Sequence, residues 1–258
     1  MSVHISRRRF GVSIGGAFAS FALGGACRRA GEPRQPDEGR LTVRPHAITE
    51  TSARGERALG LDGTRDAILH LPETAPKNPL PLIVLFHGAG QSAEDVLSRV
   101  GAAPDQAGVA VLAPNSRGRS WDAIRGSFGR DVAFINRALE LVFDTVAVDP
   151  ARLAVGGFSD GASYALSLAL INGDLFPRAV AFSPGFVIDG VPHGTPRFFI
   201  SHGTADPILP IDSCSRRIVA GLQKRGYDVT FREFDGRHEI PPDIAREGMQ
   251  WVSGTPAV

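Results

Sequence analysis

The pentapeptide Gly-Phe-Ser-Asp-Gly at residues 157–161 constrains the fold of this chain more than any other segment. It directly follows the apolar run 153–155 and precedes a helical pattern over residues 162–170. We therefore expect a strand, a very tight turn and a helix. A serine in such a turn has a strained backbone, and its neighbours must be small so that strand and helix can approach closely. The pattern predicts Ser159 as a nucleophile projecting from the sheet, beside the amides of a helix start.

A serine hydroxyl needs a histidine that takes its proton and an acid that orients the histidine, in the chain order serine, acid, histidine. His238 lies in a loop between a strand-like run at residues 229–234 and a final helical pattern. This position suits a base that swings over the serine, so we predict His238 as the base. We expect His202, at the end of an apolar run, to be structural, and His193, in a Pro- and Gly-rich connection, to be solvated.

The orienting acid is expected where another strand ends. Asp206 follows the apolar run 198–201 through a short turn, and catalytic groups collect at the carboxyl ends of the strands of an open parallel sheet. Asp235 shares the loop of His238 and is expected to shape its turn, whereas Asp189 lies in a flexible connection. We therefore predict Asp206 as the acid.

Acyl transfer also needs two N–H donors for the oxyanion, one from the residue after the nucleophile and one from the loop after an earlier strand. That strand is expected at residues 82–86, and it runs into His-Gly-Ala-Gly at residues 87–90. We predict the N–H groups of Ala89 and Asp160 as the oxyanion hole. We expect His87 to be a structural residue that holds this loop.

Strand-like and helix-like patterns alternate along the chain, which is typical of a mostly parallel sheet with helices on both faces. Paired edge strands are expected at residues 57–61 and 67–71, and further strands at residues 82–86, 109–113, 152–155, 179–182, 198–201 and 229–234. Helical patterns fall between them, for example at residues 131–142 and 213–224. We therefore predict an α/β fold with one catalytic domain over residues 41–258.

Taken together, the H-G-x-G turn and the turns around Ser159, Asp206 and His238 resemble those of the α/β-hydrolase superfamily. Within it the chain is similar to the branch of small carboxylesterases, phospholipases and acyl-protein thioesterases, with feruloyl esterases and polyhydroxybutyrate depolymerases as neighbours. The resemblance covers roughly residues 81–252. It implies a serine carboxylic-ester hydrolase with Ser159, Asp206 and His238 as its triad. Asp160 departs from the thioesterase-like branch, where glutamine commonly follows the nucleophile.

Composition and motifs argue against several other classes. The 28 lysines and arginines nearly balance the 27 aspartates and glutamates, and they are scattered rather than gathered in a basic stripe. The chain has no Cys/His cluster or H-E-x-x-H spacing for zinc, no lysine-containing phosphate loop and no dinucleotide fingerprint. We therefore expect no metal, no cofactor and no nucleic-acid partner.

The amino terminus predicts export. Ser-Arg-Arg-Arg-Phe at residues 6–10 precedes an uncharged Gly- and Ala-rich stretch at residues 11–26. We interpret residues 1–26 as a signal of the twin-arginine type, too short for a membrane span. Cys27 follows, and either it is acylated and anchors the protein to a membrane or the signal is simply cleaved nearby. Residues 27–40 are expected to form a solvated tether, in a protein that is periplasmic or a membrane-anchored lipoprotein.

The substrate is inferred from short connections and loop aromatics. Residues 183–197 are too few for a separate cap domain, so Ser159 is expected in a shallow cleft. Phe186 either lines the acyl pocket or packs in the core, and Trp121 either stacks on an aromatic acid or packs under its loop. Short-chain or aromatic esters are the expected substrates. The alternatives are an amidase or peptidase with the same triad, and a non-catalytic binding protein on the same scaffold.

Overall fold

The computed structural model describes residues 38–48, 54–73 and 79–254. The predicted signal at residues 1–26, the predicted lipidation site Cys27 and most of the predicted tether lie outside these ranges. Within the described residues, no helix combines the length and the apolar character that a membrane crossing requires.

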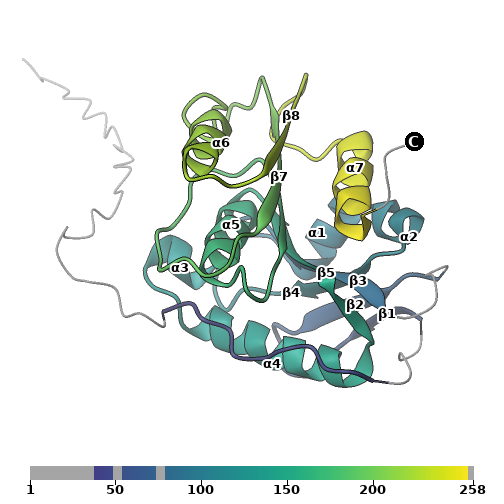
Figure 1. Cartoon of the computed structure of the whole chain (residues 1–258). Coiled ribbons are helices and arrows are strands. Elements are labelled where there is room, and N and C mark those ends of the chain that lie inside the picture. Colours follow the sequence, from purple (N-terminus) through teal and green to yellow (C-terminus); the bar gives the residue numbers. More distant parts are fainter. Residues whose placement is uncertain (1–37, 49–53, 74–78, 255–258) are drawn as a thin grey trace, which may run out of the picture. The chain divides into compact units, whose positions relative to one another are not determined.

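One eight-stranded sheet runs through the described part of the chain, in the spatial order β1-β2-β4-β3-β5-β6-β7-β8 (Figure 1). The strands are β1 Gly55–Ala58, β2 Ala67–Leu71, β3 Leu80–Phe86, β4 Ala110–Pro114, β5 Val148–Phe158, β6 Arg178–Phe182, β7 Arg197–Gly203 and β8 Val229–Phe234. β2 pairs antiparallel with β1 and with β4, whereas all pairs from β4 to β8 are parallel. The carboxyl ends of β3, β5, β6, β7 and β8 therefore lie along one edge.

Helices cover both faces of this sheet (Figure 1). They are α1 Ala93–Val100, α2 Ala103–Ala107, α3 Asp122–Arg125, α4 Arg130–Thr145, α5 Asp160–Ile171, α6 Ser215–Lys224 and α7 Pro242–Ser253. Buried side chains of α3, α4, α5 and α6 belong to one hydrophobic cluster, and those of α1, α2 and α7 belong to a second cluster. The predicted mostly parallel sheet with helices on both faces is thus confirmed.

The burial of the strands explains why their sequences were readable. Every residue of β3 is buried, and so are the last six residues of β5, as expected for parallel strands covered on both faces. The first edge strand differs from its predicted range, because β1 is Gly55–Ala58 rather than residues 57–61. Gly60 has a φ of 74° and donates its N–H to the Asp66 carboxylate (2.5 Å), so a turn begins there.

The first described residues run past the end of α5 and along α4 (Figure 1). The Arg40 guanidinium donates two hydrogen bonds to the Asp174 carboxylate (2.6 and 2.8 Å), and the Asn172 side chain donates to the Gly39 carbonyl (2.9 Å). The bonds from Arg40 hold the pKa of the Asp174 carboxyl well below its usual range. Residues 38–40, which we expected in the tether, are therefore held against the domain.

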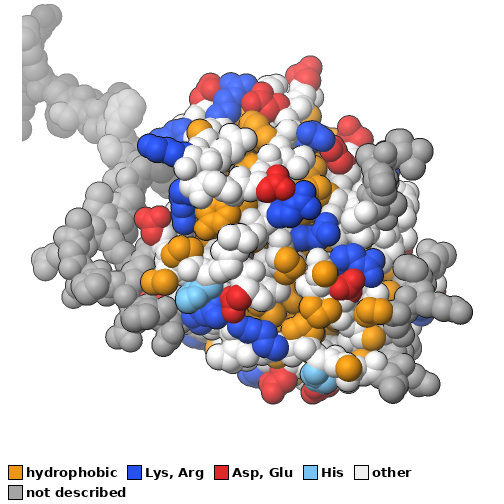
Figure 2. Space-filling model, viewed as in Figure 1, with side chains coloured by type: hydrophobic (Ala, Val, Ile, Leu, Met, Phe, Trp, Pro, Cys, Tyr) orange, Lys and Arg blue, Asp and Glu red, His pale blue; other side chains and the backbone are white. Residues whose placement is uncertain are grey.

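The charged side chains on the surface are mixed in sign. Figure 2 shows Lys and Arg side chains interspersed with Asp and Glu on the face that it views, without a continuous basic stripe on that face. The sequence contains 28 basic and 27 acidic residues, so neither sign is in large excess.

Candidate active site

Ser159 lies between β5 and α5, at the carboxyl end of a central strand. Its backbone has a φ of 57° and a ψ of −120°, a conformation that a non-glycine residue adopts only under strain. The Ser159 N–H donates to the Phe182 carbonyl at the end of β6 (2.9 Å), and the Ser159 carbonyl accepts from the Ser163 N–H (3.1 Å). These two bonds hold the strained turn between strand and helix.

Two glycines make this turn sterically possible. A Cβ atom on Gly157 would collide with the backbone of Gly161, and a Cβ atom on Gly161 would collide with the carbonyl oxygens of Phe86 and His87. The amino end of α5 therefore sits against the end of β3 as well as the end of β5. This close approach is the physical reason for the small residues around Ser159.

His238 and Asp206 come together from the loops after β8 and β7. His238 Nδ1 lies 2.6 Å from Asp206 Oδ2, and the His238 ring packs on the Phe158 ring with a centroid distance of 4.7 Å. Because Phe158 immediately precedes Ser159, this contact brings the imidazole to the elbow. An ionised carboxylate only accepts, so Nδ1 carries the hydrogen and Nε2 of the neutral ring has a free lone pair.

The Ser159 hydroxyl makes no hydrogen bond to His238 within the described residues. The observed link between them is the contact of the His238 ring with Phe158, the residue that precedes Ser159. Hydrogen bonds between nucleophile and base are often long without substrate and tighten in the complex.

The Asp206 carboxylate is buried and fully engaged. Burial on its own raises the pKa of this carboxyl, but the N–H of Leu209 (2.9 Å), the His238 ring and the N–H of Ile208 (2.8 Å) outweigh it and lower the pKa below its ordinary value. The carboxylate is therefore ionised at neutral pH and oriented for His238.

His202 stands behind the acid and is fully buried. Its Nε2 faces two acceptors, the Leu209 carbonyl (2.7 Å) and Asp206 Oδ2 (3.1 Å), so Nε2 carries the hydrogen. Nδ1 then accepts from the Ser215 hydroxyl (2.6 Å). Burial lowers the pKa of His202, which keeps the ring neutral. His202, predicted as structural, thus contacts the carboxylate oxygen that also receives His238.

The two predicted oxyanion donors lie on either side of the contact between β3 and α5. Asp160 is the first residue of α5, where an N–H has no acceptor inside the helix. Ala89 is exposed in the turn after β3. Within the described residues, neither N–H donates to a protein acceptor.

His87 is buried at the end of β3 and links two segments. Its Nε2 accepts from the Ser116 N–H (3.0 Å), and its Nδ1 donates to the Gly88 carbonyl (2.7 Å). Burial lowers the pKa of this histidine, so the ring is neutral. The loop after β3 is thereby joined to the segment after β4.

Trp121 requires a correction. We considered it as a substrate contact, but its side chain is fully buried. The indole N–H donates to the His87 carbonyl (2.9 Å), and the ring stacks on Tyr164 with a centroid distance of 5.2 Å. Trp121 therefore packs under its loop. Its N–H has the internal hydrogen-bond partner that a buried indole requires.

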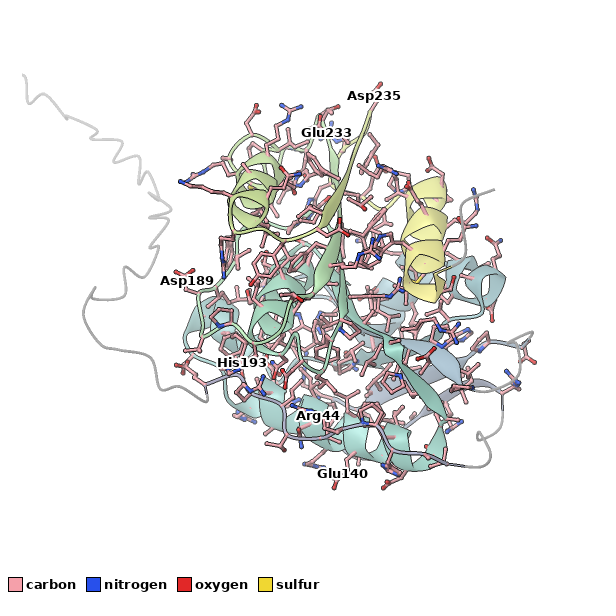
Figure 3. All side chains as sticks on the ribbon, viewed as in Figure 1. Arg44, Glu140, Asp189, His193, Glu233 and Asp235 are labelled. Carbon is pink, nitrogen blue, oxygen red and sulfur yellow. The ribbon has the colours of Figure 1, made fainter. Side chains whose placement is uncertain are left out.

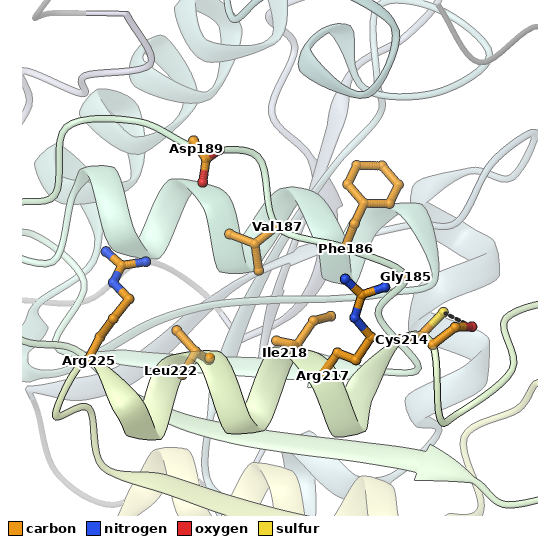
Figure 4. Close-up of a pocket in the computed structure, with 11 residues that line it drawn as sticks. Gly185, Phe186, Val187, Asp189, Cys214, Arg217, Ile218, Leu222 and Arg225 are labelled. Carbon is orange, nitrogen blue, oxygen red and sulfur yellow. Dashed lines mark hydrogen bonds between the residues drawn. The ribbon is translucent and has the colours of Figure 1, made fainter. Parts of the chain in front are cut away.

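Phe186 is 42% exposed and lines a cavity of about 340 Å³ between the loop after β6 and α6 (Figure 4). Val187, Ile218 and Leu222 form the apolar part of this cavity. Arg217 of α6 and Arg225, the residue after α6, lie at either end of it (Figure 4). Ser159 is not among the residues lining the cavity. A contact between Phe186 and substrate stays a prediction.

The other candidates lie away from the elbow. Asp235 is exposed at the tip of the loop after β8, and Asp189 and His193 belong to the connection between β6 and β7 (Figure 3). In the described part of the chain, no cluster of His, Cys, Asp or Glu side chains is arranged to hold a metal ion.

The fold and the elbow define an α/β-hydrolase, and comparisons with known proteins specify the family. The sequence profile of the Phospholipase/Carboxylesterase family matches residues 112–253, and the chain belongs to this family. Solved structures show the same fold. The carboxylesterase of Bacillus cereus has a TM-score of 0.58 at 20% identity over 75% of this chain and 95% of that one, and the carboxylesterase from Mesorhizobium loti has 0.59 at 22% over 78% and 100%.

Curated relatives are identical to this chain at about one aligned residue in three. The putative esterase NocK of Nocardia uniformis subsp. tsuyamanensis is 32% identical over 185 residues, which cover 67% of this chain and 53% of NocK. Feruloyl esterase C of Emericella nidulans is 32% identical over 158 residues, or 57% of each chain. This chain thus spans little more than half the length of these relatives.

Sequence reasoning missed the role of Ser120. Its hydroxyl donates to Asp160 Oδ2 (2.6 Å), across 40 positions of the chain. No local pattern signals such a bond, because Ser120 is in a loop and its partner begins a helix. The contact of His202 with Asp206 has a weak signal, since the two residues lie four positions apart at the carboxyl end of the same strand.

Proposed function

We propose that this protein is a serine carboxylic-ester hydrolase that acts through Ser159, His238 and Asp206. The observation that carries the proposal is the 2.6 Å bond between His238 and Asp206, on a ring packed against the residue before the strained Ser159. The family membership supports hydrolysis of carboxylic esters.

In the proposed reaction, His238 Nε2 takes the Ser159 proton as the hydroxyl oxygen attacks the ester carbonyl. The N–H groups of Ala89 and Asp160 hold the oxyanion of the tetrahedral intermediate. The intermediate collapses to an acyl-enzyme, and the alcohol leaves with the proton from His238. Water then attacks the acyl-enzyme by the same steps and releases the acid. The ionised Asp206 stabilises the imidazolium that forms twice in each cycle.

We further propose short-chain or aromatic esters as substrates. The connection between β6 and β7 has no helix among its described residues, so this connection forms no helical cap beside the elbow. The names of several relatives specify feruloyl esters, whose acid is aromatic. The exposed Phe186 is the side chain that we propose for contact with the acyl group.

The test is hydrolysis by the purified full-length protein of nitrophenyl acetate, butyrate and octanoate and of methyl ferulate. Ser159→Ala should lose on the order of 10⁴- to 10⁶-fold in kcat, because the nucleophile is removed. Ser98→Ala, which changes an exposed serine of α1, is the matched control and should retain full activity. A folded wild type that exceeds Ser159→Ala on none of these esters would exclude the proposal.

An amidase or peptidase with the same triad is the competing activity, because an elbow does not by itself choose between ester and amide. Nitroanilide analogues of the same acyl groups distinguish them. We expect ester turnover without comparable amide turnover, whereas a non-catalytic scaffold would turn over neither.

For the amino terminus, we propose export by the twin-arginine route and acylation of Cys27. Mass spectrometry of the mature protein from a bacterial membrane fraction tests both. A diacylglycerol-modified Cys27 at the new amino terminus is the expected species. A soluble periplasmic form that begins at an unmodified residue nearby would show cleavage without anchoring.

A further inference from the structure

Three consecutive residues of the segment after β4 each bond a different part of the predicted oxyanion hole. The Arg119 carbonyl accepts from the Gly90 N–H (2.7 Å), directly beside the donor Ala89. The Ser120 hydroxyl donates to the side chain of Asp160 (2.6 Å), the residue of the other donor. The Trp121 indole N–H donates to the His87 carbonyl at the start of the same turn (2.9 Å).

Residues 115–121 are themselves firmly attached to the sheet. Asn115 accepts from the Ala93 N–H (2.9 Å) and donates to the Asp66 carbonyl (3.0 Å). The Ser116 N–H bonds His87, and the guanidinium of Arg65 bonds the Ser116 carbonyl. Because this segment is fixed to the sheet, the groups that residues 119–121 bond are held in place relative to the sheet.

The two donors otherwise belong to separate elements. Ala89 lies in an exposed turn, and Asp160 begins a helix after a strained residue. An oxyanion hole works only if both N–H groups point to one place before the charge develops. Residues 119–121 bond the backbone of one element and the side chain of the other, so they couple the positions of the two donors.

The Asp160 carboxylate gives this coupling a second consequence. A carboxylate on an oxyanion-hole residue would oppose the developing negative charge if it turned toward the substrate. The Ser120 hydroxyl bonds Oδ2 and so holds the carboxylate toward residues 119–121. The buried Ser120 side chain is only 7% exposed, so water does not readily replace this bond.

We propose that Ser120 is a positioning residue for the oxyanion hole, acting through Asp160 and together with the bonds of Arg119 and Trp121. The inference rests on the proposed ester hydrolase function. Ser120 takes no part in proton transfer. It fixes the site at which the tetrahedral oxyanion is bound, and its loss affects the transition state more than the bound ester.

The test compares Ser120→Ala, Ser120→Thr and Asp160→Ala with wild type in the full-length protein. Ser120→Ala should lower kcat on the order of 10- to 100-fold with little change in KM, less than outright removal of a donor. Binding of a trifluoromethyl ketone, whose adduct carries an oxyanion, should weaken by a similar factor. Ser120→Thr keeps a hydroxyl and should restore most of the loss. Ser120→Ala should add little in the Asp160→Ala background, because the two residues form one bond.

The matched control is Ser92→Ala. Ser92 also bonds a carboxylate, that of Asp95, in the cap of α1 (3.1 Å), so this variant loses the same kind of bond outside the site. It should lower the melting temperature while kcat stays at the wild-type value. Equal kcat in Ser120→Ala and Ser92→Ala, or a loss confined to KM, would overturn the proposal.

Hydrogen exchange provides a readout that does not need activity. The amide of Gly90 should exchange faster in Ser120→Ala than in Ser92→Ala, because the coupling between the turn and α5 is lost. If the wild type hydrolysed no ester, the proposed function would fail while this measurement still decided the coupling. Unchanged exchange at Gly90 would show that Ser120 does not hold the turn.

Discussion

His87 and His202 occupy equivalent places in two regions of the molecule, and they are arranged in opposite ways. Both are fully buried, both lie at the carboxyl end of a parallel strand, and both precede a glycine. His87 carries its hydrogen on Nδ1, for the Gly88 carbonyl, whereas His202 carries it on Nε2, for the Leu209 carbonyl and Asp206. The surrounding donors and acceptors, rather than the residue type, choose the tautomer.

The difference separates the two halves of the site. The His87 region contains Ala89, whose N–H is a proposed donor to the negative oxyanion. The His202 region holds a negative charge that is already present on Asp206. In both, burial keeps the imidazole neutral, so that it acts as a fixed pair of hydrogen-bonding atoms. Ser159, the proposed nucleophile, lies between these regions, and each region can be disturbed separately.

The largest effect in the His202 region is expected from Asp206→Asn. The amide nitrogen would face the N–H of His238 and that of His202, so His238 would have to move its hydrogen from Nδ1 to Nε2. Nε2 could then no longer take the Ser159 proton, and kcat should fall on the order of 10⁴-fold. Steady-state kinetics on nitrophenyl acetate measure this loss. Asp235→Asn, in the exposed loop after β8, is the control, and a comparable loss there would reassign the acid.

How far the sequence predicts this site depends on the range of each interaction. The positions of Ser159, Asp206 and His238 beyond strand ends could be predicted because each follows a strand-like apolar run, and parallel strands bring such turns to one edge. Their catalytic roles stay predictions. Trp121 was ambiguous because a loop aromatic has no periodicity that tells which way its ring points. The bond between Ser120 and Asp160 spans 40 positions, and only the folded chain reveals it.

A smaller effect, on the free energy of unfolding, is expected from His87 and His202 themselves, and it can be compared directly between the two residues. Burial lowers the pKa of His87 and of His202 from 6.5. Below pH 6.5 the unfolded chain therefore binds protons that the native state does not, so stability is lost as the pH falls through this window. Each histidine should contribute a slope of at most about 1.4 kcal/mol per pH unit to the free energy of unfolding.

His87→Gln and His202→Gln test this contribution by urea unfolding at pH values on either side of 6.5. Each variant should show a shallower loss of stability toward acid than the wild type, whatever its stability at neutral pH. Equal shallowing in the two variants would show that the regions titrate alike despite their opposite tautomers. A wild-type slope in His202→Gln alone would mean that His202 is already protonated beside Asp206.

The smallest effect is expected at Asp174, where a charge is held at the surface instead of inside. Asp174→Asn removes the acceptor of Arg40 and Arg44, and a partly exposed ion pair of this kind contributes less than about 1 kcal/mol. The lowered pKa of Asp174 means that its contribution persists at neutral pH and is lost only as the pH falls through that low value.

Asp212→Asn, which breaks an exposed pair with Arg216 close in sequence, is the matched control. Because Asp174 binds both Arg40 and Arg44 whereas Asp212 binds neither, Asp174→Asn should speed tryptic cleavage at Arg40 and Arg44 while kcat stays unchanged. Equal cleavage in both variants would place the attachment in the Asn172 and Asn136 hydrogen bonds instead.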